Sequence, residues 1–163
     1  MSLSLKWGLI SAGAAILLFV VRALTSTNPF DNKAWGWTIV TIAVSIAMIV
    51  LPHREFKNEG DGYMSFSQGF RIGFMASLVS LIVYGLFVMF YAGVIDTEVM
   101  NNMYDAQREE MEGNNMSDEQ IDMAIGFTQK LFWPIFFVMG LIFSTIFVLI
   151  ITIFTQKKSP ESI

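Results

Sequence analysis

The sequence contains no cysteine and only one histidine, His53. The lack of cysteine excludes disulfide bonds, zinc fingers and thiol chemistry. A single histidine leaves little scope for a metal site built from imidazole ligands. The Ser-His-Asp, HExxH, Walker and dinucleotide-binding patterns are also missing from the sequence, and each of these is tied to a known catalytic or binding mechanism. We therefore expect no enzyme activity, no metal site and no cofactor.

Charged residues are absent over long stretches. They make up 15% of the 163 residues, whereas 54% are hydrophobic, and the mean hydropathy is +0.56. The run from Ile72 to Ile95 carries no charge. At about 1.5 Å per residue, a helix of this length spans the roughly 30 Å hydrocarbon core of a bilayer. This composition predicts an integral membrane protein, with the lipid bilayer as its main partner.

Four hydrophobic segments are long enough to be transmembrane helices. The predicted spans cover about residues 7–24, 35–51, 70–95 and 131–154 of the sequence. Arg22 lies near one end of the first span and is expected to reach the lipid headgroups, while Lys6 and Trp7 anchor the other end. Pro52 is expected to end the second span. We predict one all-α membrane domain over residues 1–163, with four transmembrane helices.

The hydrophilic segment of residues 96–130 predicts an extramembrane αα-hairpin between spans three and four. A first helix is expected from Asp96 to Glu112, ended by Gly113. Ser117 and Gln120 form a capping-box pattern at the start of a second helix that leads into the last span. Ser65 and Gln68 form the same pattern before the third span. Pro134 is expected either to kink the junction with the last span or to lie in the first turn of a new helix.

The distribution of positive charges predicts the orientation. An even number of spans places both termini on one side, and a turn is expected over 25–33, a polar link over 53–62 and a loose tail over 159–163. The terminal side then carries six cations, Lys6, Arg54, Lys57, Arg71, Lys157 and Lys158, and the other side carries four, Arg22, Lys33, Arg108 and Lys130. The positive-inside rule therefore favours cytoplasmic termini.

Two motifs resemble a known family. The first is Tyr63-Met-Ser-Phe-Ser-Gln-Gly-Phe-Arg-Ile-Gly-Phe74, followed by an apolar span, and the second is Met103-Tyr-Asp-Ala-Gln-Arg-Glu-Glu-Met-Glu112 with the Met-Ser-Asp-Glu-Gln-Ile start that follows it. In this order they resemble the bacterial membrane family catalogued as domain of unknown function number 4199, over nearly the whole chain. The resemblance implies a short four-span protein of the inner membrane of Gram-negative Bacteroidota, with a periplasmic hairpin. It implies no activity, ligand or catalytic residue.

Several residues in and near the spans are candidates for packing or lipid contacts. Gly69, Gly73 and Ser77 form a small-xxx-small ladder, which lets helix backbones approach closely in lipid. Arg71 and Arg54 are candidate contacts for a lipid headgroup or another anion. Arg71 has two alternative explanations, a salt bridge to an acidic residue of the 53–62 link or an ordinary interfacial anchor, and we favour the anchor.

The hairpin carries a methionine stripe and many acidic residues. Met103, Tyr104 and Met111 lie at roughly helical spacing and form a candidate partner surface. Methionine thioethers also bind Cu(I), but the spacing is explained by packing alone. The acidic residues lack EF-hand spacing, so we expect a solvated face rather than a calcium site. Their charge also makes the hairpin unsuited to nucleic acid.

Three functional hypotheses follow. The first is a non-catalytic association or accessory protein of the envelope, which binds itself or another membrane protein through the hairpin, although the membrane surface or the other hairpin helix could also cover the methionine stripe. The second is a small transporter or channel subunit. It requires that the hydroxyl-bearing residues face inward together, namely Thr38, Thr41, Ser45, Ser77, Ser80, Tyr84, Ser144 and Thr145. The third is a lipid-handling protein that uses Arg71 and Arg54.

Overall fold

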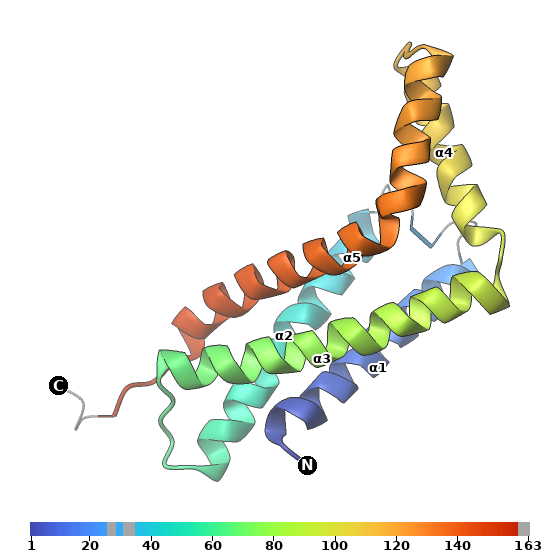
Figure 1. Cartoon of the computed structure of the whole chain (residues 1–163). Helices are drawn as coiled ribbons and strands as arrows, with labels where there is room; N and C mark the ends of the chain where they lie inside the picture. The colour runs from blue at the N-terminus through green and yellow to red at the C-terminus, as the bar shows by residue number, and fades with distance from the viewer. Residues whose placement is uncertain (26–28, 31–34, 160–163) are drawn as a thin grey trace.

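The computed structural model describes residues 1–25, 29–30 and 35–159, and this part of the chain is all-helical (Figure 1). Four helices are long and apolar enough to cross a membrane, namely α1 (Leu3–Thr25), α2 (Trp35–Glu59), α3 (Phe66–Phe90) and α5 (Asp118–Thr155). A shorter helix, α4 (Val99–Gly113), precedes α5. These elements confirm the predicted all-α fold with four candidate spans. Most of the predicted turn at 25–33 and residues 160–163 of the predicted tail lie outside the described residues.

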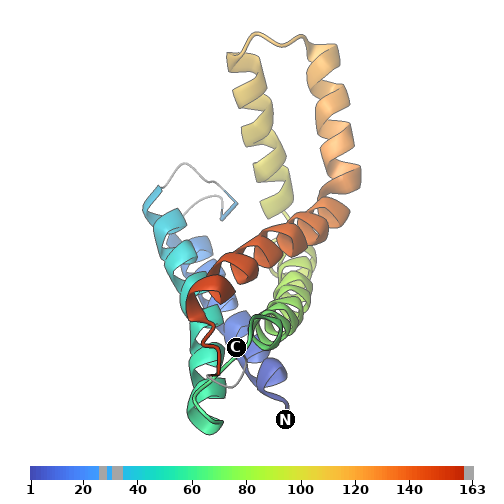
Figure 2. The ribbon, with the colours of Figure 1, turned by 90° about the vertical axis from the view of Figure 1, so that its left-hand side faces the viewer.

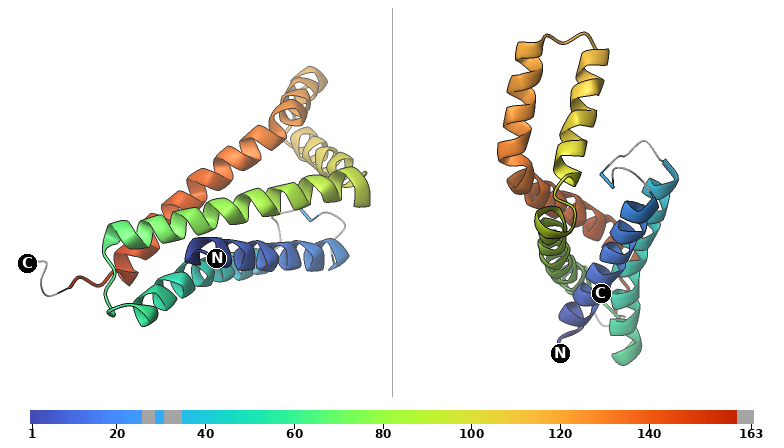
Figure 3. Two further views of the ribbon diagram at one scale, coloured as in Figure 1. Left: turned by 60° about the horizontal axis from the view of Figure 1, so that its bottom comes forward. Right: turned by 90° about the vertical axis from the view of Figure 1, so that its right-hand side faces the viewer.

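Helix α3 lies at the centre of the bundle and packs against α1 and α5, with α2 beside all three (Figures 2 and 3). The contact between α1 and α3 depends on Gly8, which is buried. A Cβ atom at this position would lie 2.6 Å from Val79 Cβ and 2.9 Å from the carbonyl oxygen of Ala76. The two helices therefore approach so closely that only glycine fits at Gly8, as is common where helices pack in lipid.

Helix α2 does not end at Pro52, so this prediction was wrong. The helix continues through Pro52 to Glu59, and both Pro52 and His53 are buried. The imidazole Nε2 of His53 is 2.8 Å from the carbonyl oxygen of Gly69, and its Nδ1 is 2.8 Å from Thr155 Oγ1. These contacts join the last turns of α2 to α3 and α5. Interactions with neighbouring helices thus keep α2 helical beyond Pro52, although a proline by itself favours the end of a helix.

The start of α1 and the end of α5 lie at the same end of the bundle, and polar contacts link all four long helices there. Lys6 Nζ lies 2.7 Å from Glu55 Oε1, and Trp7 Nε1 donates to Glu55 Oε2 at 2.9 Å. Lys6 and Trp7, expected to be lipid anchors, therefore tie the start of α1 to α2. Met64, before α3, and Lys157, after α5, exchange two backbone hydrogen bonds of 2.9 Å each.

The predicted helix starts at Ser65 and Ser117 are confirmed. In both cases the serine hydroxyl accepts from the backbone N–H of the glutamine three residues later, and that glutamine side chain accepts from the serine N–H. Helix α5 then runs without interruption through Pro134 and bends sharply between its hairpin part and its spanning part (Figure 1). Pro134 lacks the N–H that would bond the carbonyl of Lys130, which accounts for the bend.

Helix α4 and the first part of α5 lie side by side and leave the bundle at a steep angle (Figures 1 and 2). A short π-helical segment, η1 (Tyr91–Ile95), joins α3 to this pair. The buried side chains of the pair are Val99 and Met103 on α4 and Ile121 and Ile125 on α5. Arg108 and Asp122 form an ion pair between the two helices. The hydrogen bond from Arg108 to Asp122 raises the pKa of the guanidinium, which stays charged in any case.

Candidate functional site: a cavity between the spans

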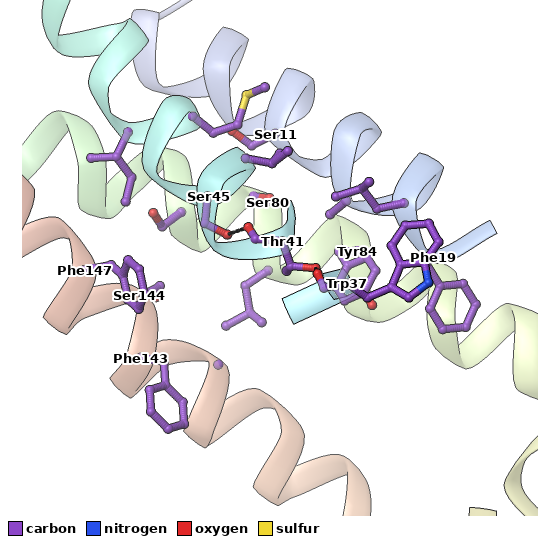
Figure 4. A pocket seen from close by; sticks show the side chains of 18 of the residues that line it. Ser11, Phe19, Trp37, Thr41, Ser45, Ser80, Tyr84, Phe143, Ser144 and Phe147 are labelled. Carbon is purple, nitrogen blue, oxygen red and sulfur yellow. Dashed lines mark hydrogen bonds between the residues drawn. The ribbon is translucent and has the colours of Figure 1, made fainter. Parts of the chain in front are cut away.

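A cavity of about 400 Å³ lies between α1, α2, α3 and α5. Its wall combines aliphatic and aromatic side chains with hydroxyl groups that come from all four helices (Figure 4). The hydroxyl-bearing lining residues are Ser11, Thr41, Ser45, Ser77, Ser80, Tyr84 and Ser144. A mostly apolar cavity with a few convergent polar groups is the usual form of a small-molecule site.

Hydroxyls on α2 and α5 form hydrogen bonds to their own helix. Thr41 Oγ1 donates to the carbonyl oxygen of Trp37 at 2.9 Å, and Ser45 Oγ donates to that of Thr41 at 2.8 Å (Figure 4). Ser144 Oγ donates to the carbonyl oxygen of Leu141 at 3.0 Å. Each hydroxyl keeps its lone pairs. These three groups can therefore act as hydrogen-bond acceptors for a molecule in the cavity.

The serine hydroxyls on α1 and α3 differ from those on α2 and α5 in their hydrogen bonding. Ser11, Ser77 and Ser80 line the cavity and are only partly exposed. None of the three forms a side-chain hydrogen bond within the described part of the chain, although a serine inside a helix commonly bonds the carbonyl one turn earlier. These hydroxyls thus keep free donors and acceptors at the wall of one cavity.

One end of the cavity carries a positive charge and several aromatic rings. Arg22, in the last turn of α1, lines the cavity together with Phe19, Trp37 and Tyr84. The rings of Phe19 and Tyr84 meet edge to face, with centroids 6.2 Å apart. Among residues 1–25, 29–30 and 35–159, Arg22 forms no salt bridge. Its guanidinium is therefore available to an anionic group at this end of the cavity.

The opposite end adjoins an apolar core. Ile49 and Phe147 line the cavity, and Ile49 packs with Val148 and Ile151 in one buried cluster. His53 and its partners on α3 and α5 follow one turn further along α2. The cavity thus has the cationic Arg22 at one end and this apolar core at the other.

The structure places the predicted packing residues in two different environments. A Cβ atom at Gly69 would lie 2.9 Å from Thr152 Cγ2, and one at Gly73 would lie 2.9 Å from Val148 Cγ1, so these glycines face α5 directly. Ser77 lines the cavity instead. Arg71 and Arg54 are both exposed near the end of the bundle where α1 begins and α5 ends, and neither lines the cavity between the spans.

The predicted partner surface on the hairpin is largely covered within the chain. Met103 is only 6% exposed, and Tyr104 and Met111 are half-buried. Met103 lies on the buried side of α4, next to α5, so it does not present a free surface. This is the packing alternative considered for the methionine stripe, in which the other hairpin helix covers it. The most exposed large apolar side chains on the hairpin are Met123 and Phe127, at 70% and 61%.

Most of the hydroxyl-bearing residues expected to face inward do line the cavity. They are Thr41, Ser45, Ser77, Ser80, Tyr84 and Ser144. Thr38 is exposed on α2, and the hydroxyl of Thr145 donates to the carbonyl of Leu141 instead. Sequence reasoning missed Ser11 and the role of Arg22 in the cavity. A serine within the first apolar span was the available signal for Ser11, because polar residues in a span tend to face the bundle interior.

The described helices contain no group of three or more metal-ligating side chains of the His, Cys, Asp or Glu type. Four long apolar helices around a cavity define a small multi-pass membrane protein. Residues 6–157 match the model of the family described as protein of unknown function DUF4199, so the chain belongs to this family. Comparisons with curated proteins and with solved structures gave no match.

Proposed function

We propose that the protein binds an amphipathic molecule in the cavity between its spans. The observation that carries this proposal is the convergence of three hydroxyls without hydrogen-bond partners, those of Ser11, Ser77 and Ser80, on one cavity in an otherwise apolar bundle. Unpaired polar groups are unfavourable in such surroundings. A bound molecule that forms hydrogen bonds with these hydroxyls would remove the free-energy cost of leaving them unpaired.

The shape and charge of the cavity indicate the class of ligand. Arg22 at one end suits an anionic headgroup, and Trp37 and Tyr84 beside it suit the boundary between polar and apolar parts. The apolar end, with Ile49 and Phe147, suits a hydrocarbon tail. A volume of about 400 Å³ is typical of small-molecule sites. These features favour a single-chain anionic lipid over a fully polar solute.

Binding is also better supported than permeation. A channel or transporter needs a polar route to both faces of the membrane at some stage of its cycle. The apolar cluster of Ile49, Val148 and Ile151 offers no polar group at this end of the cavity. Transport of the bound molecule therefore requires this cluster to open, whereas binding requires no rearrangement.

Native mass spectrometry of the full chain in mild detergent tests the proposal, with lyso-phosphatidylglycerol as the anionic probe and lyso-phosphatidylcholine as the zwitterionic one. Ser80→Leu fills the cavity and should abolish retention of both probes. Arg22→Gln should weaken the anionic probe roughly tenfold, which corresponds to one charge-assisted hydrogen bond. Ser67→Leu, on the exposed side of α3, is the matched control. Equal retention by wild type and Ser80→Leu, with both variants folded, would refute the proposal.

We propose the orientation predicted from the charge distribution, with the termini in the cytoplasm and the hairpin in the periplasm of a bacterial inner membrane. The absence of cysteine allows a direct test, because any single introduced thiol reports alone. Ser2→Cys should be protected from a membrane-impermeant maleimide in intact spheroplasts, and Gly113→Cys should be labelled. The reverse pattern would invert the orientation.

Association with a second copy of the chain or with an envelope protein is a second proposal. Its support is the exposure of Met123 and Phe127, one helical turn apart on the hairpin. Replacement of both by serine should reduce the crosslinked oligomer or the recovery of a partner from cells. An unchanged crosslinking pattern would show that Met123 and Phe127 do not form the association surface.

A further inference from the structure

A second hollow lies at the end of the bundle where α1 begins and α5 ends. It is lined by three cationic side chains, Arg54 and Lys57 from α2 and Lys157 from the segment after α5. Val50, Asn58, Gly62 and Thr155 complete its lining. The sequence separates Lys157 from the other two cations by about a hundred residues, so only the fold brings the three together.

Specific contacts hold two of these cations in place. Lys57 Nζ donates to the carbonyl oxygen of Thr155 at 2.9 Å, which ties it to the last turn of α5. The backbone of Lys157 is fixed by its two hydrogen bonds to Met64, and its ammonium lies 5.1 Å from the ring centroid of Tyr63. Neither contact neutralises a positive charge.

No acidic side chain of the described residues forms an ion pair with the three cations, and this includes Glu59 and Asp61, which adjoin the lining residues Asn58 and Gly62. Within the described residues, Arg54, Lys57 and Lys157 form no salt bridge, because the ion pairs found there are those of Lys6 with Glu55 and Arg108 with Asp122. Glu55 is on α2 near these cations, but Lys6 and Trp7 occupy its carboxylate. Like charges held close together repel each other unless an anion lies between them.

We propose that this hollow, hereafter the basic hollow, binds a phosphate group. The guanidinium of Arg54 can bond two phosphate oxygens at once, and the two ammoniums supply further donors. Val50 marks the point where the apolar part of α2 reaches the hollow, so the three cations lie where an apolar span gives way to polar residues. A phosphate can come from an anionic lipid headgroup or from a soluble phosphate ester, and both present the same chemistry to these side chains.

Two binding measurements on the full chain distinguish these sources. In the first, native mass spectrometry compares retention of dilauroyl phosphatidylglycerol with that of dilauroyl phosphatidylcholine. In the second, calorimetry follows inorganic phosphate and glycerol phosphate. Preferential retention of the anionic lipid assigns a headgroup to the hollow, and binding of the soluble esters assigns a free phosphate. Binding of neither would overturn the proposal.

Variants locate the site. Arg54→Gln and Lys157→Gln should each weaken binding roughly fivefold, the usual effect of one cation near an anionic membrane surface. Matched controls are Lys158→Gln, next to Lys157, and Arg71→Gln, an exposed cation on α3; neither residue lines the hollow. Arg54 is exposed and has no hydrogen bond to lose within the described residues, so its variant should fold normally.

Equal losses in the control variants would show attraction to overall charge and overturn the proposal. Loss in Ser80→Leu without loss in Arg54→Gln would place the lipid in the cavity between the spans and also overturn it. Loss in Arg54→Gln with full retention in Ser80→Leu supports the basic hollow, whatever the outcome for the proposed function.

Discussion

Glycine at position 8 sets the distance between α1 and α3, and a pair of substitutions can measure its effect. A methyl group at Gly8 would overlap Val79 Cβ at 2.6 Å and the Ala76 carbonyl oxygen at 2.9 Å. Neither atom is the end of a flexible side chain, so the helices themselves must separate. Gly13, on the same helix, has no atom within 4 Å of the equivalent methyl group. The two sites therefore differ in packing while sharing one helix.

The two substitutions are expected to change the free energy of unfolding in opposite directions. Alanine is favoured over glycine inside a helix by about 0.5–1 kcal/mol. Gly13→Ala should therefore leave the free energy of unfolding unchanged or raise it by up to about that amount. Overpacking in a tightly packed contact typically costs about 1–3 kcal/mol, so Gly8→Ala should be destabilising overall. Because both variants gain the same helix preference, the difference between them isolates the packing effect.

Reversible unfolding of the full chain in mixed detergent and SDS micelles, followed by tryptophan fluorescence, would measure this difference. We expect Gly8→Ala to be less stable than Gly13→Ala by about 1–3 kcal/mol. Circular dichroism should show the same helix content for both variants before unfolding. If Gly8→Ala proved as stable as Gly13→Ala, the close approach of α1 and α3 would be refuted.

Three further substitutions test other contacts. His53→Ala should lower the free energy of unfolding by about 2–4 kcal/mol, because it removes one buried and one partly buried hydrogen bond and leaves a cavity. Glu59→Ala is the exposed control, and equal stability of the two variants would contradict the role of His53. Ser117→Ala should destabilise the start of α5 by about 1 kcal/mol, and this should be measurable as faster hydrogen exchange there. Ser67→Ala is the control. Unchanged exchange in Ser117→Ala, or an equal change in the control, would contradict the capping role of Ser117. Pro134→Ala should straighten α5 and lengthen the distance between spin labels at its two ends; an unchanged distance would assign the bend to packing instead.

Local signals predicted the helix boundaries well. The capping boxes at Ser65 and Ser117 depend on residues three positions apart, so the sequence alone contains the whole interaction. The signal at Pro52 was also local but was overruled, because His53 and Lys57 find partners on α3 and α5. The shared partner of His53 and Lys57 is Thr155, which lies about a hundred residues away. No sequence pattern near Pro52 indicates this contact.

The cavity was partly predictable for a similar reason. Hydroxyl groups in apolar spans tend to face the bundle interior, and this expectation gave most of the lining residues. It failed at Thr38, which shares a helix face with Ser45 but is exposed near the start of α2 and does not line the cavity. Arg22 appeared to be an ordinary interfacial anchor, since its contribution to the cavity depends on how α1 sits against α2 and α3.

Helix α5 connects the hairpin mechanically to the last span. One continuous helix forms both the hairpin arm and the last span, and its final turn contacts His53 and Lys57. The arm before Lys130 is about 20 Å long at the usual rise per residue, and the missing hydrogen bond at Pro134 makes the junction the easiest place to bend. A sideways push on the hairpin tip is therefore taken up first as bending at this junction. The rest of α5 is stiff, so only the part of the torque that passes the junction reaches the far end of the span, beside the basic hollow.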